Sequence, residues 1–367
     1  MKSHLRIHRI PPHTEEWFEF RRNGIGGSEA GTVLNINKYD TAARLYHEKI
    51  GSIPHRTDDN MAMFLGRYLE EQIANLWKFY DGSQDGLIEN YKNKKVVRNC
   101  RNINGYVVNP NYPWLFGSVD RLINKDGGVN LITGEALKEE GILEIKNQSY
   151  WAGKVWEDGI PIYHLTQVHV YMIILETDYS EIALLNDGNK LVVEKIQRDE
   201  QLCQQIISLT RSWWFDRVVP AKEALKIRDE ADAQGKVGEA EQAEAVIQRL
   251  EPDPDHSEAY KDFMSDSFVK ERDIVDGTMD LFDKAKAYEV LKGIARETKD
   301  NQELLKNQFI KFMKDHGADS ISFDNLGSVN WAEVKGRASR TFGCKIKDKP
   351  KPDAIKDEFN KINLNCY

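Results

Sequence analysis

Two short apolar stretches, WLFGSVDRLI at residues 114–123 and GILEIKN at residues 141–147, determine the expected fold. Both are rich in β-branched and other apolar residues, as is typical of strands in a buried sheet. The second stretch nevertheless contains Glu144, and Asp120 lies near the end of the first. A buried charge without a partner costs much free energy, so a carboxylate in an apolar strand indicates a specific role.

Glu144 and Lys146 project to the same face of the second strand, because residues two apart on a strand point the same way. Asp120 adds a second carboxylate from the neighbouring strand. Hydrolysis of a phosphodiester needs charge neutralisation on the phosphate and an activated water, and a divalent cation held by carboxylates supplies both. Mg²⁺, or Mn²⁺ in its place, prefers oxygen ligands, which Asp120, Glu144 and the carbonyl of Ile145 supply. Lys146 is then expected to orient the water or stabilise the developing charge.

The E-x-K pattern alone is weak, because it occurs twice more in this chain. One copy is Glu297–Lys299, and the other is Glu333–Lys335, with Asp324 nine residues before it. Both lie in polar or highly charged surroundings, whereas Glu144 lies between apolar residues. The copy at Glu144 is therefore the expected catalytic one.

Three regions are predicted along the chain. Residues 1–219 alternate helix-like and strand-like segments and are expected to form the catalytic domain. Residues 220–316 are highly charged and helix-prone, and residues 317–367 form a small β-like tail. Further expectations are a helix with Ser28 as its N-cap, a strand at residues 94–99, a β-hairpin at residues 180–199 with an Asp-Gly turn, and a helix that ends before Pro220.

Composition excludes some classes of protein. The four cysteines form no CxxC pair, which argues against a zinc or iron–sulfur site and favours reduced thiols in a cytoplasm. No apolar run approaches the roughly 18 residues of a membrane span. The net charge of −8 does not exclude DNA as the partner, because local fields decide binding.

Five segments, in this order, resemble the phage lambda exonuclease and YqaJ-type viral recombinase family. They are Trp17–Arg21 running into Ile25-Gly-Gly-Ser28, Gly66-Arg-Tyr-Leu-Glu70, Gly117-Ser-Val-Asp120, Leu143-Glu-Ile-Lys146, and Gln167 in LTQVHVYM. The resemblance covers about residues 14–219. It implies an α/β fold: a PD-(D/E)xK restriction-endonuclease-like core with a mixed central sheet flanked by helices, to which this chain adds a helical C-terminal extension.

The resemblance also implies roles for single residues. Asp120 and Glu144 would bind metal, and Glu70 would lie near a second ion. Lys146 would be the catalytic lysine, and Gln167 would assist from the following helix. Arg21 and Ser28 would hold the terminal 5′-phosphate of a DNA strand.

The implied activity is that of a 5′-to-3′ exonuclease on linear double-stranded DNA, which generates single strands for phage-type recombination. Members of the family form rings, so a homo-oligomer of three or four chains is expected. A single-strand annealing protein is an expected partner, and the expected location is the cytoplasm, that of a bacterial host if a phage encodes the protein.

Several alternatives stay open. Arg22 is as plausible a phosphate contact as Arg21, Glu71 follows Glu70, and Ser28 can simply cap its helix. An endonuclease or a Cas4-like nuclease of the same fold is the first rival function, although the scattered cysteines count against the iron–sulfur Cas4 type. A catalytically inactive DNA-binding scaffold is the second rival, and the intact Asp120, Glu144 and Lys146 count against it.

Overall fold

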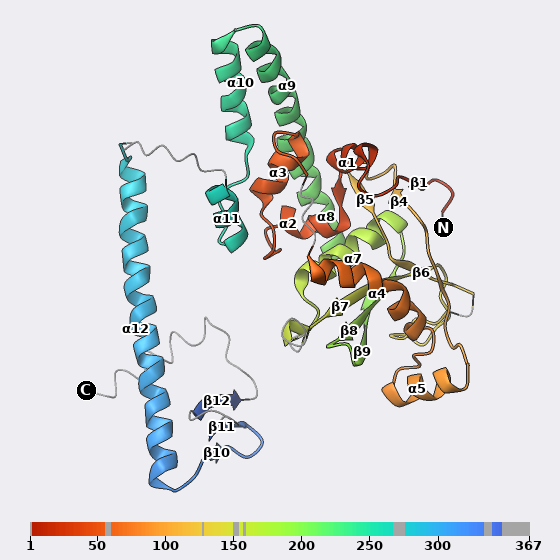
Figure 1. Ribbon diagram of the computed structural model, residues 1–367, viewed down its shortest axis with the longest axis vertical. Helices are drawn as coiled ribbons and strands as arrows, with labels where there is room; N and C mark the ends of the chain where they lie inside the picture. Colours follow the sequence, from red (N-terminus) through yellow and green to blue (C-terminus); the bar gives the residue numbers. More distant parts are fainter. Residues whose placement is uncertain are drawn as a thin grey trace. The chain divides into compact units, whose positions relative to one another are not determined.

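The computed structural model describes residues 2–55, 60–126, 128–149, 154–156, 159–266, 276–333 and 340–346. The chain divides into two compact units, Met1–Val269 and Lys270–Tyr367, which are described separately. Figure 1 shows the elements of both. In the described part of the chain, no helix combines the length and the apolar character that crossing a membrane requires.

A five-stranded mixed sheet forms the centre of the first unit. Its strand order is β3-β6-β7-β8-β9, with bounds Cys100–Arg101 (β3), Arg121–Ile123 (β6), Gly141–Gln148 (β7), Tyr179–Asn186 (β8) and Lys190–Gln197 (β9). Strands β7 and β8 are parallel and are joined through helix α7 (Ile162–Leu175), whereas the other neighbours are antiparallel. The predicted hairpin is confirmed: Asp187 and Gly188 both have positive φ, as a type I′ turn between β8 and β9 requires.

A second sheet of four strands lies in the same unit. Its order is β1-β4-β5-β2, with bounds Arg6–His8 (β1), Tyr106–Val108 (β4), Leu115–Gly117 (β5) and Ile25–Gly26 (β2). The stretch WLFGSVDRLI therefore supplies two strands rather than one, because β5 belongs to this sheet and β6 to the central sheet. Asp120 lies in the connection between them, directly before β6.

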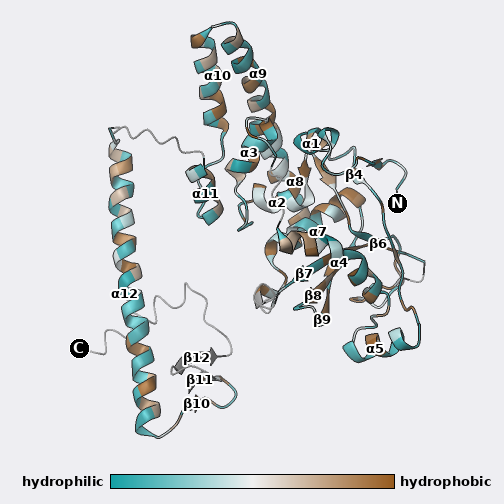
Figure 2. Ribbon diagram, viewed as in Figure 1, coloured by the Kyte–Doolittle hydropathy of each residue, from teal (hydrophilic) through white to brown (hydrophobic). Residues whose placement is uncertain are grey.

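Helices cover both faces of the central sheet. The remaining helices of the first unit are α1 (Glu15–Arg22), α2 (Gly27–Val33), α3 (Ala42–Ile50), α4 (Met61–Trp77), α5 (Gln84–Lys92), η1 (Lys154–Trp156), α8 (Glu200–Ser212), η2 (Trp213–Val218), α9 (Val219–Ala233), α10 (Val237–Leu250) and α11 (Glu258–Asp266). Strand β7 alternates between two cores: Ile142 packs in the core that contains α7, and Leu143 and Ile145 pack in the core that contains α4. Figure 2 shows apolar residues concentrated in α7 and the strands beside it.

The glycines before Ser28 permit a close approach of two helices. A Cβ on Gly27 would lie 2.3 Å from Cε1 of Tyr171, so only glycine lets α2 pack this closely against α7. The predicted N-cap at Ser28 is wrong. The N-cap is Gly26, whose N–H donates to the side chain of Glu29 at 2.7 Å, so Glu29 caps the helix from inside its first turn.

Two further local predictions are wrong. Residues 94–99 form no strand, and the edge strand β3 begins only at Cys100. The helix before Pro220 does not end there: the π-helical segment η2 leads directly into α9, with Pro220 in its first turn. Proline is tolerated at such a position, because its missing N–H is not needed there. Residues Ala221, Ala224 and Leu225 of α9 are buried in the main core, and the compact unit extends beyond residue 219 to Val269.

The second unit is built on one long helix. Helix α12 spans Met279–Asp315 and is followed by a three-stranded antiparallel sheet of β10 (Ser320–Ser322), β11 (Gly327–Glu333) and β12 (Arg340–Ile346). Among its described side chains, Met313 and Val329 are the fully buried apolar ones. The expected α/β class, with a mixed central sheet flanked by helices and a helical C-terminal region, is confirmed.

Candidate active site

The two predicted carboxylates meet at the start of β6 and the middle of β7. Oδ2 of Asp120 accepts a hydrogen bond from the main-chain N–H of Ile145 at 2.8 Å, which fixes Asp120 beside β7. Glu144 is buried at 2% exposure, whereas Asp120 is half-buried. The structure therefore brings together the carboxylates that the sequence predicted.

Lys146 and Gln167 complete this cluster. Nζ of Lys146 lies 2.6 Å from Oε1 of Glu144 and 3.3 Å from Oε1 of Gln167. Nε2 of Gln167 donates to Oε1 of Glu144 at 2.8 Å and to the hydroxyl oxygen of Tyr171 at 3.0 Å. Because each polar atom of the Gln167 amide has a partner of the right kind, the amide has one favourable orientation.

Burial and mutual repulsion raise the pKa of both carboxyl groups. The pKa of Asp120 is raised well above its usual value by burial and by the nearby charges of Glu144 and Glu70. Burial also raises the pKa of Glu144, although Lys146 and Gln167 oppose this. For Lys146, burial would lower the pKa, but Glu144 and Asp120 outweigh it and raise the pKa. Two neighbouring carboxylates that disfavour each other's charge are the groups that a divalent cation neutralises.

The donor set fits such a cation. Oε2 of Glu144 is buried and has no hydrogen-bond partner within the described structure, so it is available as a ligand. Carboxylate oxygens are the ligands that Mg²⁺ prefers. Among the described residues, no three His, Cys, Asp or Glu side chains lie close enough together to hold an ion as they stand. Asp120 and Glu144 thus form a two-carboxylate site.

Glu70, the predicted third carboxylate, is bonded to an arginine. Oε1 of Glu70 accepts from Nη1 of Arg121 at 2.5 Å, and Oε2 of Glu71 accepts from Nη2 of the same side chain at 2.6 Å. The charge of Glu70 still influences both Asp120 and Glu144, so it lies near the centre. Sequence analysis missed Arg121, although it directly follows Asp120.

His164 is a second residue that sequence analysis missed. It precedes Gln167 by one turn of α7, so the two share a helix face, and its ring stacks on Trp156 with centroids 5.3 Å apart. Burial, and then the charge of Lys146, lower its pKa to about 3. His164 is therefore neutral near pH 7, and the helical spacing from Gln167 was the signal available in the sequence.

The predicted phosphate-binding residues line a cleft of about 1250 Å³ that reaches the end of the strand carrying Glu144 and Lys146. Arg21, Ser28, Arg44 and Arg67 line it, together with residues 147–149 at the end of β7. The guanidinium of Arg21 stacks over Trp17 and bonds to the carboxylate of Glu29, which also accepts from Lys49. Arg22, the open alternative, does not line the cleft and pairs with Glu19 at 3.5 Å.

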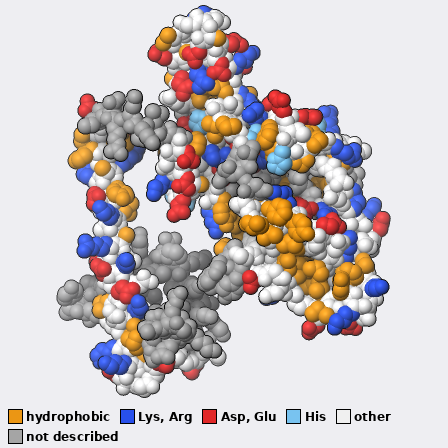
Figure 3. Space-filling view, viewed as in Figure 1, with side chains coloured by type: hydrophobic (Ala, Val, Ile, Leu, Met, Phe, Trp, Pro, Cys, Tyr) orange, Lys and Arg blue, Asp and Glu red, His pale blue; other side chains and the backbone are white. Residues whose placement is uncertain are grey.

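Helix α4 forms part of the rim of this cleft. Its first turns expose Met61, Phe64 and Tyr68, and Figure 3 shows hydrophobic side chains gathered over this helix. The rings of Phe64 and Tyr68 lie 5.8 Å apart and nearly parallel, with an angle of 18° between them. Met63, Leu65 and Arg67 of the same helix line the cleft.

Residues 16–180 match the family model described as YqaJ-like viral recombinase domain. This segment of the chain is thus similar to the proteins of that family. It contains the whole cluster around Asp120 and Glu144, together with Glu70, Gln167, Arg21 and Ser28.

Known proteins resemble part of the chain. The uncharacterized protein YqaJ of Bacillus subtilis (strain 168) is 30% identical over 208 residues, which are 56% of this chain and 56% of that protein, so the chain spans about half the length of this relative. An alkaline exonuclease, LHK-Exo from Laribacter hongkongensis, is similar with a TM-score of 0.45 at 18% identity, over 60% of this chain and 100% of that chain. A phage related exonuclease from Haemophilus somnus 129PT gives a TM-score of 0.34 at 13% identity, over 51% of this chain and 91% of that chain.

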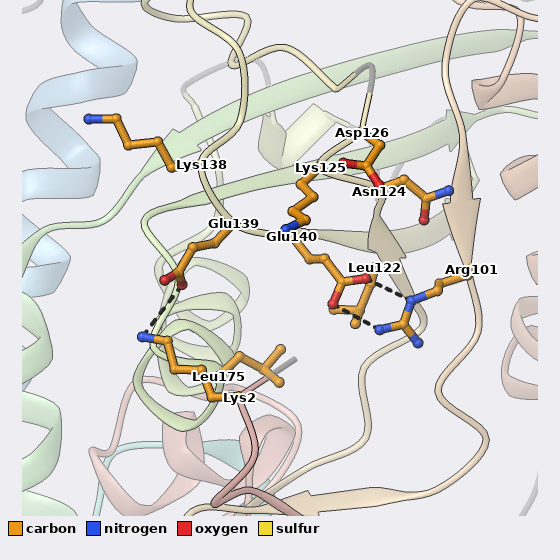
Figure 4. A pocket seen from close by; sticks show the side chains of 10 residues that line it. All are labelled: Lys2, Arg101, Leu122, Asn124, Lys125, Asp126, Lys138, Glu139, Glu140 and Leu175. Atoms are coloured by element: carbon orange, nitrogen blue, oxygen red, sulfur yellow. Dashed lines mark hydrogen bonds and ion pairs between the residues drawn. The ribbon is translucent and has the colours of Figure 1, made fainter.

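A second cavity of the first unit lies away from the candidate site. It has a volume of about 540 Å³ and shares no residue with the Asp120 and Glu144 cluster. Figure 4 shows two pairs among its charged side chains: Arg101 bonds to both carboxylate oxygens of Glu140, and Lys2 lies 3.5 Å from Glu139. These pairs account for much of its charge without a ligand.

The rival E-x-K copies lie outside the segment that matches the family model. Glu297 and Lys299 are in α12, where residues two apart do not face each other. Lys335 and the side chain of Glu333 lie outside the described residues. Of the two copies whose side chains the structure describes, the one at Glu144 and Lys146 has its two side chains in contact.

Proposed function

We propose that this protein is a Mg²⁺-dependent deoxyribonuclease that degrades linear double-stranded DNA from its ends. The observation that carries the proposal is the convergence of Asp120, Glu144 and Lys146 at one point of the sheet. The matching YqaJ-like viral recombinase domain supports a role in phage-type recombination, in which the enzyme generates single-stranded DNA.

In the proposed mechanism, Asp120 and Glu144 would hold a metal ion, with the carbonyl of Ile145 as a further ligand, and Glu70 would contribute to holding a second ion. A bound divalent ion neutralises the phosphate and lowers the pKa of a coordinated water. Lys146 stays protonated, since its pKa is raised, and its ammonium stabilises negative charge that develops on the phosphate. Gln167 positions both side chains, because it donates to Glu144 and accepts from Lys146.

The cleft supports recognition of a DNA end. Arg21, Arg44 and Arg67 give it cationic groups for phosphates, although Glu29 and Glu48 offset part of this charge. Arg21 and Ser28 are proposed to hold the terminal 5′-phosphate, and this contact gives the 5′-to-3′ direction. The exposed rings of Phe64 and Tyr68 at the rim suit stacking with bases.

The proposal extends to assembly and partners. A processive exonuclease gains from encircling its product, so the protein is proposed to form a closed ring of three or four chains with heterologous interfaces. A single-strand annealing protein is the proposed partner in the cytoplasm of a bacterial host. The basis for both is the similarity to the YqaJ-like family.

One assay separates this function from its rivals. End-labelled linear duplex DNA and covalently closed circular duplex DNA are incubated with the protein and Mg²⁺. An exonuclease releases mononucleotides from the linear DNA and leaves the circle intact. Cleavage of the circle would instead indicate an endonuclease on the same metal site, and binding without cleavage would indicate an inactive scaffold.

A further inference from the structure

Arg121 makes three hydrogen bonds at the edge of the metal site. Its Nη1 donates to Oε1 of Glu70 at 2.5 Å and to the carbonyl oxygen of Asp120 at 2.6 Å, and its Nη2 donates to Oε2 of Glu71 at 2.6 Å. Its side chain is 6% exposed, against 32% for Glu70 and 62% for Glu71. Arg121 is therefore a nearly buried cation that joins two adjacent glutamates of α4 to the residue before β6.

The position of Arg121 follows from the alternation of β6. Leu122 packs in the core that contains α7, and Ile123 packs in the core that contains α4. Arg121, two residues before Ile123, shares the α4 face. Helix α4 is itself fixed by buried apolar residues, among them Ile73 and Trp77, so its place does not depend on the arginine. Arg121 instead determines the orientation of the Glu70 carboxylate.

Glu70 thus has two competing partners. Its negative charge disfavours the charged forms of Asp120 and Glu144, which is unfavourable while no cation lies between them. The guanidinium of Arg121 removes part of that cost by holding Oε1 of Glu70 in a charge-assisted hydrogen bond. The hydrogen bond from Nη2 to Glu71 holds the other nitrogen of the same guanidinium in place.

We propose that Arg121 is a positioning residue that takes the place of a cation at Glu70, so that a divalent ion recruiting Glu70 must displace this arginine contact. The inference rests on the proposed metal-dependent function. Its consequence is that the ion held through Glu70 binds more weakly than the ion held by Asp120 and Glu144. The strength of the arginine contact then sets the concentration at which this weaker ion binds.

Binding of Mn²⁺ to the full-length protein without DNA tests this directly. The electron paramagnetic resonance signal of free Mn²⁺ is measured during a titration and gives the number and affinity of bound ions. Arg121→Met removes the cation but retains a long apolar stem, and we expect the weaker ion to bind about tenfold more tightly than in the wild type, the low end of what a hydrogen bond to a charged group contributes. Unchanged or weakened binding of that ion would overturn the proposal.

Matched variants exclude a merely structural role. With Glu70→Gln the weaker ion should be lost, and adding Arg121→Met should then change nothing. Glu71→Gln removes only the anchoring contact and should tighten the weaker ion less than Arg121→Met does. Arg121→Lys keeps the buried charge without the two-armed contact, so it should give a smaller gain in affinity for the weaker ion. This variant replaces Arg121→Met if the methionine variant does not fold. An unchanged affinity in Arg121→Lys would count against the proposal.

The same titration separates this inference from the proposed function. Asp120→Asn and Glu144→Gln should abolish the tighter ion. If they do not, the metal site and the proposed function are both wrong. If they do, while Arg121→Met leaves the weaker ion unaffected, only the role of Arg121 is wrong.

Discussion

Nε2 of Gln167 lies 2.8 Å from Oε1 of Glu144, and this bond joins helix α7 to the central strand of the sheet. The same amide contacts Lys146 and Tyr171, so it sets the orientation of the two charged side chains together. Partners that orient a metal ligand typically matter by one to two powers of ten in affinity or rate.

Replacing Gln167 with alanine should therefore lower the cleavage rate by about ten- to a hundredfold and weaken metal binding, with the fold retained. Both are measured in single-turnover cleavage and in metal titration. Tyr171→Phe is the matched control, because it removes one contact of the amide and leaves those to Glu144 and Lys146; it should cost about fivefold at most. Equal losses in both variants would argue against a positioning role.

Asp120→Ala, Glu144→Ala and Lys146→Ala should each lower cleavage by roughly a thousandfold or more, since a metal site supplies several kcal/mol to the transition state. The two carboxylate variants should also lose metal binding, whereas Lys146→Ala should retain the ion. Calorimetric titration with Mg²⁺ or Mn²⁺, together with a cleavage assay, gives both quantities.

The E-x-K copy in α12 provides the control for these variants. Glu297→Ala and Lys299→Ala should cleave at the wild-type rate, because the two side chains do not form a site on the helix. Loss of cleavage in these variants, with full activity in Glu144→Ala, would mean that the chemistry lies in the second unit.

End recognition predicts a preference for phosphorylated DNA. Duplexes with a 5′-phosphate should be degraded faster than duplexes with a 5′-hydroxyl, because a charge-assisted contact from Arg21 is available only to the phosphate. Arg21→Ala should slow degradation of phosphorylated ends by roughly ten- to a hundredfold and leave hydroxyl ends nearly unchanged.

Arg22→Ala is the matched control, since Arg22 does not line the cleft. It should retain the preference for a 5′-phosphate. A wild-type protein that degrades both kinds of end equally fast would exclude the assignment of Arg21 and Ser28.

Glu48 should make the free energy of unfolding depend on pH. Burial alone would raise its pKa, but hydrogen bonds from His55 and Arg44 outweigh it and hold the pKa at about 2, against an ordinary value of 4.5. A carboxyl group whose pKa is lower in the folded than in the unfolded protein stabilises the fold at pH values above its pKa in the unfolded state. This contribution is lost as the pH falls towards 2. The contribution is roughly 3 kcal/mol at neutral pH.

Urea unfolding of the wild type and of Glu48→Gln between pH 2 and 7 checks this. The variant should be less stable at neutral pH, and the difference in free energy of unfolding should shrink steadily below pH 4.5. Parallel curves for the two proteins would show that Glu48 carries no such linkage.

The predicted ring has a mass that can be measured. One chain has a mass of 42.3 kDa, so light scattering at micromolar concentration should give three or four times this value. A monomer that is active and processive would remove the need for a ring.

Local periodicity was enough to predict the strand that carries Glu144 and Lys146. Glu144 and Lys146 share a face because strands alternate, and the Asp187-Gly188 turn follows from its dipeptide. The cap at Ser28 was predicted wrongly because Glu29 reaches back to Gly26, and Pro220 was misjudged because a π-helical segment precedes it.

Contacts between distant segments could not be predicted in this way. Arg121 and Glu70 are 51 residues apart, and their pairing depends on how α4 packs across the sheet. The strand expected at residues 94–99 had suitable β-branched residues, yet the pairing with β6 begins only at Cys100. The β-propensity of a segment indicates that it can form a strand, whereas its packing and pairing with neighbouring segments determine whether it does.

Strand β7 is the third of five strands, with β6 and β8 as neighbours and apolar cores on both faces. Local opening of a sheet starts at its edges, here β3 and β9, and reaches a central strand only when the whole unit unfolds. The main-chain amides of Leu143 to Lys146 should therefore be among the slowest in the protein to exchange with deuterated water. The proposed metal site is thus built into the part of the molecule expected to open last, so its geometry should persist for as long as the fold does.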